Sequence, residues 1–215
     1  MSRGFFITLE GGDGCGKSTQ CQMLLDFLKQ ERIDFIMTRE PGGSEAAEEI
    51  RQIILSGNKE KWDSISETLL FFAARRSHLV DKIWPAIQQG TWVISDRFAD
   101  STMAYQGYGR GDGLLTKQDI ENLYELVAGN FKPDLTIILD MDPTEALQRV
   151  AERGEKDRME GMDISFHNNL RNAFLDIAAK EPNRCAVINA NQAPQKVHED
   201  IIRVIRERLL NDNAS

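Results

Sequence analysis

Eight consecutive residues near the start of the chain have the types and spacing of a phosphate-binding loop. They fit the pattern G-x-x-x-x-G-K-[ST] without a gap. Together with the threonine that follows, they are Gly11, Gly12, Asp13, Gly14, Cys15, Gly16, Lys17, Ser18 and Thr19. In such a loop the backbone N–H groups face an anion, the lysine reaches the β- and γ-phosphates, and the hydroxyl binds Mg²⁺. We therefore expect this stretch to bind ATP or a similar triphosphate with Mg²⁺, with Lys17 as a catalytic residue.

The residues around the loop can form the strand and the helix that the motif requires. An apolar run at 5–9 has the length and composition of a strand. After the loop, apolar residues recur at helical spacing, at Cys21, Leu24, Leu25 and Leu28. A glycine-rich turn that merely caps an ordinary helix is the alternative interpretation, and the flanking strand and helix argue against it.

The rest of the chain alternates between strand-like and helix-like stretches, which predicts an α/β fold with a parallel sheet between two helical layers. The expected strands are 5–9, 34–38, 91–95, 135–139 and 186–188. The expected helical stretches include 44–57 with Ser44 at its N-cap, 143–153, 166–177 and 197–205. The stretch 62–89 is expected to be one helix or two, with Pro85 as a kink or a joint. A glycine-rich loop at 107–113 is expected to separate two more helices. Ligands of such sheets bind at the carboxyl ends of the strands.

Composition limits the classes of protein that the chain can be. Its 215 residues fit one domain, and a net charge of −8 argues against a general nucleic-acid binder. No apolar run approaches the ~20 residues of a membrane span, and the N-terminus leads directly into a strand, without the pattern of a signal peptide. We therefore expect a cytoplasmic protein with no membrane or nucleic-acid partner.

The three cysteines, Cys15, Cys21 and Cys185, lack the spacing of a metal site. Cys21 and Cys185 are expected to be small core residues. Cys15 lies inside the phosphate loop, where neighbouring N–H groups favour a thiolate. An oxidation-sensitive thiol at Cys15 is therefore a hypothesis, which unchanged ATP affinity after thiol alkylation would refute.

Two of the expected strands lead into an aspartate, and strand-end aspartates hold Mg²⁺ in phosphoryl-transfer proteins. Asp96 is followed by Arg97, which pairs a metal carboxylate with a phosphate-binding guanidinium. Asp140 has no basic neighbour and leads into a helix that Asp142 can cap. We therefore expect Asp96 and Ser18 to bind the metal, and we interpret Asp140 as a loop carboxylate near a helix N-terminus.

Arginines stand out in a chain this acidic, and three of them surround a glycine. Arg149 and Arg153 lie four residues apart on one helix face, Gly154 ends that helix, and Arg158 follows in a charged stretch. A segment of this kind, at about 149–163, fits a lid that carries cations over phosphates. The alternative is a polar loop with no role.

The sequence offers no evident general base, and a phosphate acceptor would not need one. A phosphate monoester carries about −1.5 to −2 charge at pH 7, so it is already an ionised nucleophile. Positioning and charge neutralisation by a lysine, Mg²⁺ and arginines would then suffice. This pattern favours transfer to a phosphate over transfer to a sugar hydroxyl.

Together the motifs resemble those of the thymidylate kinase family, and the resemblance runs from roughly 5 to 209. For example, DRFADSTMAYQ at 96–106 is close to the family signature DRYxxSxxAYQ, with Phe98 in place of the usual tyrosine. The matching segments, in the family's order, are 9–19, 38–43, 71–79, 96–106 and 139–158. The resemblance implies a P-loop NTPase fold whose five parallel strands have the order 2-3-1-4-5. It also implies a homodimer that transfers the γ-phosphoryl of ATP to dTMP, giving dTDP and ADP for dTTP synthesis.

The resemblance further implies a dTMP site. Arg51 and Arg97 would hold the acceptor phosphate, Phe71 would stack on thymine, and Arg75 would donate to the O4 edge. The other residues expected near the acceptor are Asp13, Glu40, Thr102, Tyr105 and Gln106, with Tyr105 beside the sugar and a cis Glu40–Pro41 bond. Arginine can only donate hydrogen bonds, so it suits O4 of thymine and not the N4 amino group of cytosine. His78 is expected to be a structural helix residue.

The sequence also has a place within the family. Some members carry an arginine in the phosphate loop, and Gly14 occupies that position here. The resemblance then implies the bacterial class whose lid supplies the catalytic arginine. Arg153 and Arg158 are the candidates for this lid arginine. Arg97, outside the lid, is a further expected catalytic residue, and Arg149 is expected near ATP.

Two other functions stay open at this point. A kinase of the same fold that acts on a nucleoside hydroxyl would leave Arg51 and Arg97 unexplained. A P-loop switch or assembly ATPase would need nucleotide-dependent loops and a partner surface. Turnover that requires a nucleotide acceptor would separate these possibilities.

Overall fold

Five parallel strands form one sheet in the order β2-β3-β1-β4-β5 in the computed structural model, which describes residues 3–57, 61–109, 113–154 and 162–210. The strands are β1 (Phe6–Glu10), β2 (Phe35–Arg39), β3 (Trp92–Asp96), β4 (Leu135–Asp140) and β5 (Cys185–Asn189). The predicted strand order is confirmed, and every predicted strand end lies within one residue of the observed one.

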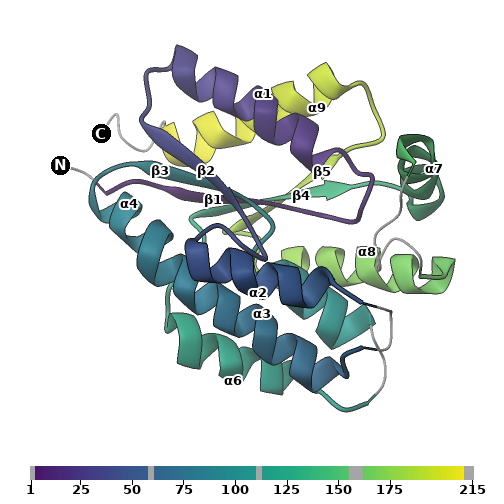
Figure 1. Ribbon diagram of the computed structural model, residues 1–215. Helices are drawn as coiled ribbons and strands as arrows, with labels where there is room; N and C mark the ends of the chain where they lie inside the picture. Colours follow the sequence, from purple (N-terminus) through teal and green to yellow (C-terminus); the bar gives the residue numbers. More distant parts are fainter. Residues whose placement is uncertain (1–2, 58–60, 110–112, 155–161, 211–215) are drawn as a thin grey trace.

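Helices cover both faces of this sheet, so the predicted three-layer arrangement is also confirmed (Figure 1). On one face lie α1 (Lys17–Gln30) and α9 (Pro194–Ile205). The opposite face carries α2 (Glu45–Leu55), α3 (Ser64–His78), α4 (Trp84–Gln88), α6 (Lys117–Ala128) and α8 (Ile164–Lys180). The helix α7 (Pro143–Arg153) follows β4 beyond the end of the sheet and packs against α8.

The central strand β1 contributes to a hydrophobic cluster on each face of the sheet, because successive side chains of a strand point to opposite faces. Ile7 and Leu9 pack with the apolar side of α1 and α9, where Leu24 and Ile201 are also buried. Phe6 belongs to a second cluster on the other face, with side chains such as Val93 and Phe98. By the same alternation, Glu10 faces the layer that contains Phe98. Cys21 and Cys185 are buried core residues, as predicted.

The helices differ from expectation mainly where π-helical turns occur. The stretch expected at 62–89 is one continuous helical run, because a π-helical turn at Leu79–Ile83 joins α3 to α4. Pro85 stands in the first turn of α4. A second π-helix, Met103–Gly109, follows α5 (Ala99–Thr102).

The second π-helix makes the expected glycine-rich loop shorter than predicted. Residues 107–109 are helical because this segment packs tightly against α8, where a Cβ on Gly109 would meet the Phe166 ring at 2.7 Å. At the helix starts, Asp142 caps α7 as predicted by accepting from the Thr144 N–H. Ser44 precedes α2 as predicted, but its hydroxyl pairs with Ser77 instead of capping the helix.

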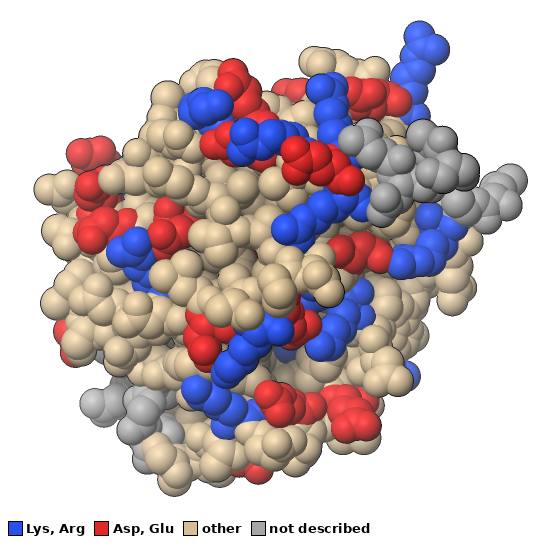
Figure 2. All heavy atoms as spheres, turned by 180° about the vertical axis from the view of Figure 1, so that it is seen from behind, with Lys and Arg blue, Asp and Glu red and all other residues tan. Residues whose placement is uncertain are grey.

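Charge is mixed on the surface. Figure 2 shows acidic and basic side chains interspersed over the face opposite to that of Figure 1. Among the helices of the described residues, none has the length and apolar character needed to cross a bilayer.

Candidate active site at the carboxyl ends of the strands

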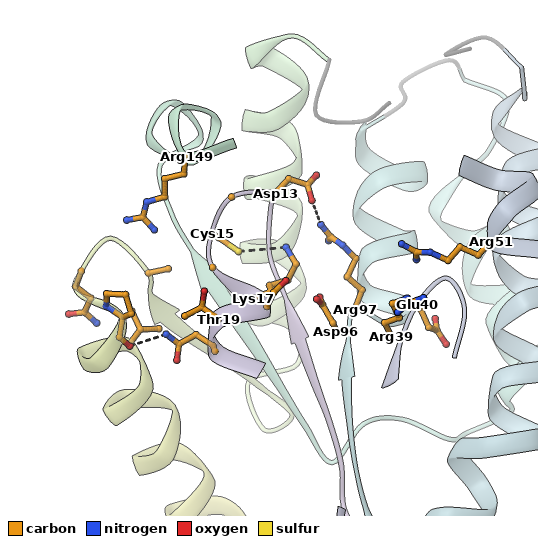
Figure 3. A pocket seen from close by; sticks show the side chains of 18 residues that line it. Asp13, Cys15, Lys17, Thr19, Arg39, Glu40, Arg51, Asp96, Arg97 and Arg149 are labelled. Atoms are coloured by element: carbon orange, nitrogen blue, oxygen red, sulfur yellow. Dashed lines mark hydrogen bonds and ion pairs between the residues drawn. The ribbon is translucent and has the colours of Figure 1, made fainter. Parts of the chain in front are cut away.

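A cleft of about 720 Å³ lies over the phosphate loop, at the carboxyl ends of β1 and β3. In Figure 3, Lys17 and Arg97 lie near its centre, Arg149 extends from α7 on one side, and Arg51 lies on the other. The cleft collects most of the residues predicted for ATP and metal, namely Asp13, Gly14, Cys15, Gly16, Lys17, Ser18, Thr19, Asp96 and Arg149. Gly11 and Gly12 lie beside it and accept hydrogen bonds from Lys17 Nζ at 3.1 and 2.7 Å.

The phosphate loop requires glycine at position 14. The φ of Gly14 is +82°, and a Cβ there would meet the carbonyl oxygen of Ala146 at 2.2 Å. An arginine at this position would therefore collide with α7 as it packs here. The neighbouring Cys15 is buried, with Lys17 Nζ 3.7 Å from its sulfur. The oxidation of Cys15 stays a prediction.

Asp96 has an oxygen that lacks a hydrogen-bond partner within the described part of the chain, and this atom is buried. It lines the cleft together with the exposed Ser18. Within the described ranges no three His, Cys, Asp or Glu residues form a metal cluster. Mg²⁺ does not require one, because it keeps several waters and takes one or two carboxylates plus phosphate oxygens. Asp96 and Ser18 therefore fit Mg²⁺.

Asp140 is engaged elsewhere. Its two carboxylate oxygens accept hydrogen bonds from Arg171 on α8, at 2.6 Å from Nε and 2.9 Å from Nη2. The preference for Asp96 over Asp140 as the metal residue agrees with this geometry.

Arg97 has a strained backbone, and both of its Nη atoms donate hydrogen bonds within the site. Its φ is +67°, which is uncommon for a residue with a side chain. Ser95 Oγ donates to its carbonyl oxygen at 2.7 Å, and its own N–H donates to the Leu9 carbonyl at 3.0 Å. This backbone conformation directs the guanidinium to Asp13 at 2.5 Å and to the Tyr105 hydroxyl at 3.0 Å.

The carboxylate of Asp13 is held in its ionised form by this network. Burial alone would raise its pKa, but the charges of Arg97 and Lys17 and the hydrogen bonds from Tyr105 and Arg97 outweigh burial. Together they lower the pKa of Asp13 to about 2. A carboxylate with so low a pKa is a poor general base near neutral pH.

Glu10 is a buried residue of this site to which the sequence assigned no role. It accepts from the Phe98 N–H at 2.7 Å and from Ser101 Oγ at 2.5 Å, so it anchors the turn that carries Arg97. Burial, together with the charge of Asp100, raises the pKa of Glu10 to about 8. The sequence signal was weak, because Glu10 is simply the last residue before the glycine loop.

A second cavity of about 140 Å³ adjoins the cleft. Asp13, Glu40, Arg51 and Arg97 line both cavities. The second cavity also contains the remaining residues predicted for dTMP, namely Phe71, Arg75, Thr102, Tyr105 and Gln106. The structure therefore brings together all of the predicted acceptor residues, and the Glu40–Pro41 bond among them is cis as expected.

Arg75 is the most deeply buried charged side chain of this second cavity. Its Nε donates to Glu40 Oε2 at 2.8 Å, and its Nη2 donates to Thr102 Oγ1 at 2.9 Å. Its Nη1 atom is buried and has no partner among the residues described. A buried donor of this kind costs about 1–3 kcal/mol until a ligand satisfies it.

His78 contacts Glu40, the carboxylate that pairs with Arg75. Its Nδ1 lies 3.0 Å from Glu40 Oε1, and its Nε2 lies 2.6 Å from Thr38 Oγ1. Its side chain is fully buried, which agrees with the structural role expected for His78.

A family model and two similar proteins that match this chain are all thymidylate kinases. The family model described as thymidylate kinase matches residues 9–201. The chain belongs to the thymidylate kinase family. A thymidylate kinase of Bradyrhizobium diazoefficiens is 49% identical over 99% of this chain and 93% of its own length. A thymidylate kinase of Caulobacter vibrioides is 46% identical over 97% of this chain and 99% of its own length.

A solved structure has the same fold as this member of the thymidylate kinase family. The crystal structure of thymidylate kinase from Ehrlichia chaffeensis superposes with a TM-score of 0.76 at 37% identity. The match covers 95% of this chain and 99% of that one. The P-loop NTPase fold predicted from the sequence is therefore confirmed.

Sequence reasoning missed one wall of the cleft in this family member. The segment after β5 contributes Ala190, Gln192, Pro194 and Val197 to the lining of this cleft. Gln20 on α1 joins this wall by donating to the Pro194 carbonyl at 2.9 Å. The rule that ligands bind at strand ends could have indicated this segment, because it directly follows the fifth strand.

Of the predicted lid at about 149–163, the structure describes 149–154 and 162–163. Arg149 is exposed and lines the cleft, and α7 ends at Arg153 with Gly154 as predicted. Arg158 lies outside the described residues. The choice between Arg153 and Arg158 as the lid arginine thus stays a prediction.

Proposed function

We propose that this chain transfers the γ-phosphoryl of ATP to dTMP, giving dTDP and ADP for dTTP synthesis. Family membership supports this reaction, and one observation of the structure carries it. The phosphate-loop cleft and the smaller cavity meet at four shared residues, Asp13, Glu40, Arg51 and Arg97. A donor phosphate in one and an acceptor phosphate in the other would meet at this junction.

On the donor side, the loop N–H groups and Lys17 bind the phosphates of ATP, and Arg149 lies over the same cleft. The segment after β5 lines the same cleft and would enclose the adenosine end of ATP. Lys17 Nζ rests on the carbonyls of Gly11 and Gly12, so a short movement exchanges these acceptors for phosphate oxygens.

On the acceptor side, Arg97 and Arg51 neutralise the phosphate of dTMP. Both line the junction, and Arg97 is fixed by Asp13 and Tyr105. No general base is needed, since the acceptor phosphate is already ionised. The low pKa of Asp13 agrees with a positioning role for this carboxylate.

Thymine occupies the inner end of the smaller cavity. Phe71 stacks on the ring, which contributes about 1–3 kcal/mol without regard to the base. The buried Nη1 of Arg75 donates to O4, which satisfies an otherwise unpaired donor. Thr102 Oγ1 accepts a hydrogen bond from Arg75 Nη2. Tyr105 lines the same cavity and would disfavour a ribose 2′-hydroxyl beside the sugar.

Magnesium is part of the proposed site. Asp96 and Ser18 would hold Mg²⁺, and the ion would neutralise charge on the triphosphate. Asp96 Oδ1, buried and without a partner in the part of the chain that is described, supports this assignment.

We also propose one kinase domain over 1–215, with a lid at about 149–163 from which Arg153 or Arg158 reaches the transferred phosphoryl. The proposed assembly is a homodimer in the cytoplasm. On adjacent helices α3 and α6, the apolar residues Ile65, Leu69 and Leu126 expose 42%, 50% and 80% of their surface, which supports association through this side.

Product analysis tests the reaction directly. The purified chain is incubated with ATP, Mg²⁺ and dTMP, and the nucleotides are separated and identified by mass. We expect dTDP and ADP in equal amounts. ADP without dTDP would refute the proposal and favour a P-loop switch or ATPase.

A further inference from the structure

Gln106 shares a buried hydrogen bond with Glu67, a residue that neither the motifs nor the mechanism uses. Gln106 belongs to the π-helix Met103–Gly109, and Glu67 lies in the first turn of α3. The Gln106 Nε2 donates to Glu67 Oε2 at 3.2 Å. The two residues are 3% and 0% exposed, so solvent does not compete for this bond.

This partner determines which end of the Gln106 amide faces which neighbour. Glu67 Oε2 is the acceptor in this bond, so the amide nitrogen of Gln106, and not its oxygen, faces the carboxyl group. The Gln106 Oε1 is therefore kept away from Glu67. This oxygen is buried and has no partner in the described part of the chain.

The smaller cavity thus has two unsatisfied groups of opposite kind among its lining residues. Gln106 supplies an acceptor, Oε1, and Arg75 supplies a donor, Nη1. The edge of thymine offers the complementary pair, an N3–H donor beside the O4 acceptor. Cytosine reverses both, with an N3 acceptor beside an N4 amino donor. Each buried mismatch costs about 1–3 kcal/mol.

We propose that Glu67 is a specificity-determining positioning residue. By holding the amide nitrogen of Gln106, it fixes the amide oxygen as an acceptor for the N3–H of the base. Arg75 then reads O4, and the two contacts together select thymine over cytosine. This inference rests on the proposed function.

The test compares four proteins: the wild type, Glu67→Gln, Gln106→Leu and the double variant. For each, kcat/KM is measured with dTMP and with dCMP at saturating ATP. In Glu67→Gln the amide of Gln106 is free to turn, so we expect the dTMP-to-dCMP ratio to fall about tenfold, which corresponds to about 1.4 kcal/mol. In the Gln106→Leu background the same change should leave the ratio unaltered.

The double variant separates this role from a merely structural one. A fall of the ratio that is equal in both backgrounds, or no fall in either, would overturn the proposal. Glu67→Asp keeps the charge but withdraws the carboxylate by one methylene, and it should lower the ratio in the same direction. Glu67→Asp therefore replaces Glu67→Gln in the test if Glu67→Gln does not fold. The exposed Glu199→Gln is the matched control and should leave the ratio unchanged.

The outcomes also distinguish this inference from the function on which it rests. A wild-type enzyme that does not phosphorylate dTMP would refute both. A wild-type enzyme that prefers dTMP, with a Glu67→Gln variant of equal preference, would refute the role of Glu67 alone.

Discussion

Arg97 and Asp13 form an ion pair of 2.5 Å that joins the end of β3 to the phosphate loop. Both residues line the two cavities at their junction, so the pair lies where donor and acceptor phosphates would meet. The Tyr105 hydroxyl donates to the second oxygen of Asp13 at 2.8 Å and keeps it in place. One carboxylate thereby orients the arginine that we propose binds the acceptor phosphate.

Loss of the charge on Asp13 should therefore affect the acceptor more than ATP. We expect Asp13→Asn to lower kcat/KM for dTMP by about tenfold to a hundredfold, because a hydrogen bond to a charged group contributes about 1.5–3 kcal/mol. The KM for ATP should change less. Steady-state kinetics with each substrate varied in turn measures both effects, and Asp26→Asn on the surface of α1 is the control. An equal loss of kcat/KM for dTMP and for ATP would contradict the positioning role of Asp13.

Arg75 should determine which base is accepted. Arg75→Lys keeps a positive charge beside Glu40 but removes the planar group whose Nη1 is unpaired. We expect the preference for dTMP over dCMP to fall by about tenfold or more, with ATP affinity little changed. Arg75→Ala is the harsher change, because it leaves Glu40 buried without its charge partner and should cost about 3–5 kcal/mol of stability. Acceptor competition assays give the preference, and an unchanged preference in Arg75→Lys would refute the role.

Glu10 should make stability depend on pH. Its pKa in the folded chain is raised to about 8 from an ordinary value near 4.5, chiefly by burial. The folded state then holds the proton more tightly than the unfolded state between these values. Its contribution is fully present below about pH 4.5 and is lost as pH rises through about 8.

We therefore expect the free energy of unfolding to fall by a few kcal/mol between pH 6 and pH 9 in the wild type. The free energy of unfolding of Glu10→Gln should fall less over the same pH range, because the glutamine side chain has no proton to lose. Urea denaturation at several pH values measures this, with Glu199→Gln as the control. Parallel pH dependence in Glu10→Gln and the wild type would show that Glu10 titrates normally.

The lid arginine should act in the chemical step. We expect Arg158→Ala to lower kcat far more than it weakens dTMP binding, because a lid cation neutralises charge on the phosphoryl in transit. Arg153→Ala is the matched variant at the end of α7. Single-turnover kinetics and equilibrium dTMP binding separate the two effects. If kcat survives in Arg158→Ala and falls in Arg153→Ala, the role belongs to Arg153.

Much of the fold could be predicted because its determinants are local. The apolar runs of the strands and the glycine pattern at 11–16 are visible in short windows, and the strand ends were correct to within one residue. Asp96 and Arg97 could be found because they stand at the end of a buried strand. The identities of the acceptor residues came from resemblance, since Phe71 and Arg75 alone have the pattern of an ordinary helix.

The remaining features depend on contacts between distant segments. The π-helix over 103–109 is set by packing against α8, which no local pattern reveals. Glu10 acquires its role from Phe98 and Ser101, and Glu67 from Gln106. In the sequence both glutamates are single acidic residues among many, and their burial decides their function.

The measurement that tests the central claim most directly is the rate of ADP release with ATP and Mg²⁺ in the presence of different acceptors. The acceptors are dTMP, dUMP, dCMP, AMP and thymidine. The site described here requires strong turnover with dTMP, weaker turnover with dUMP and little with the others. Turnover with thymidine but not with dTMP would contradict the roles of Arg51, Arg97, Phe71 and Arg75, and hydrolysis that ignores the acceptor would contradict the kinase assignment itself.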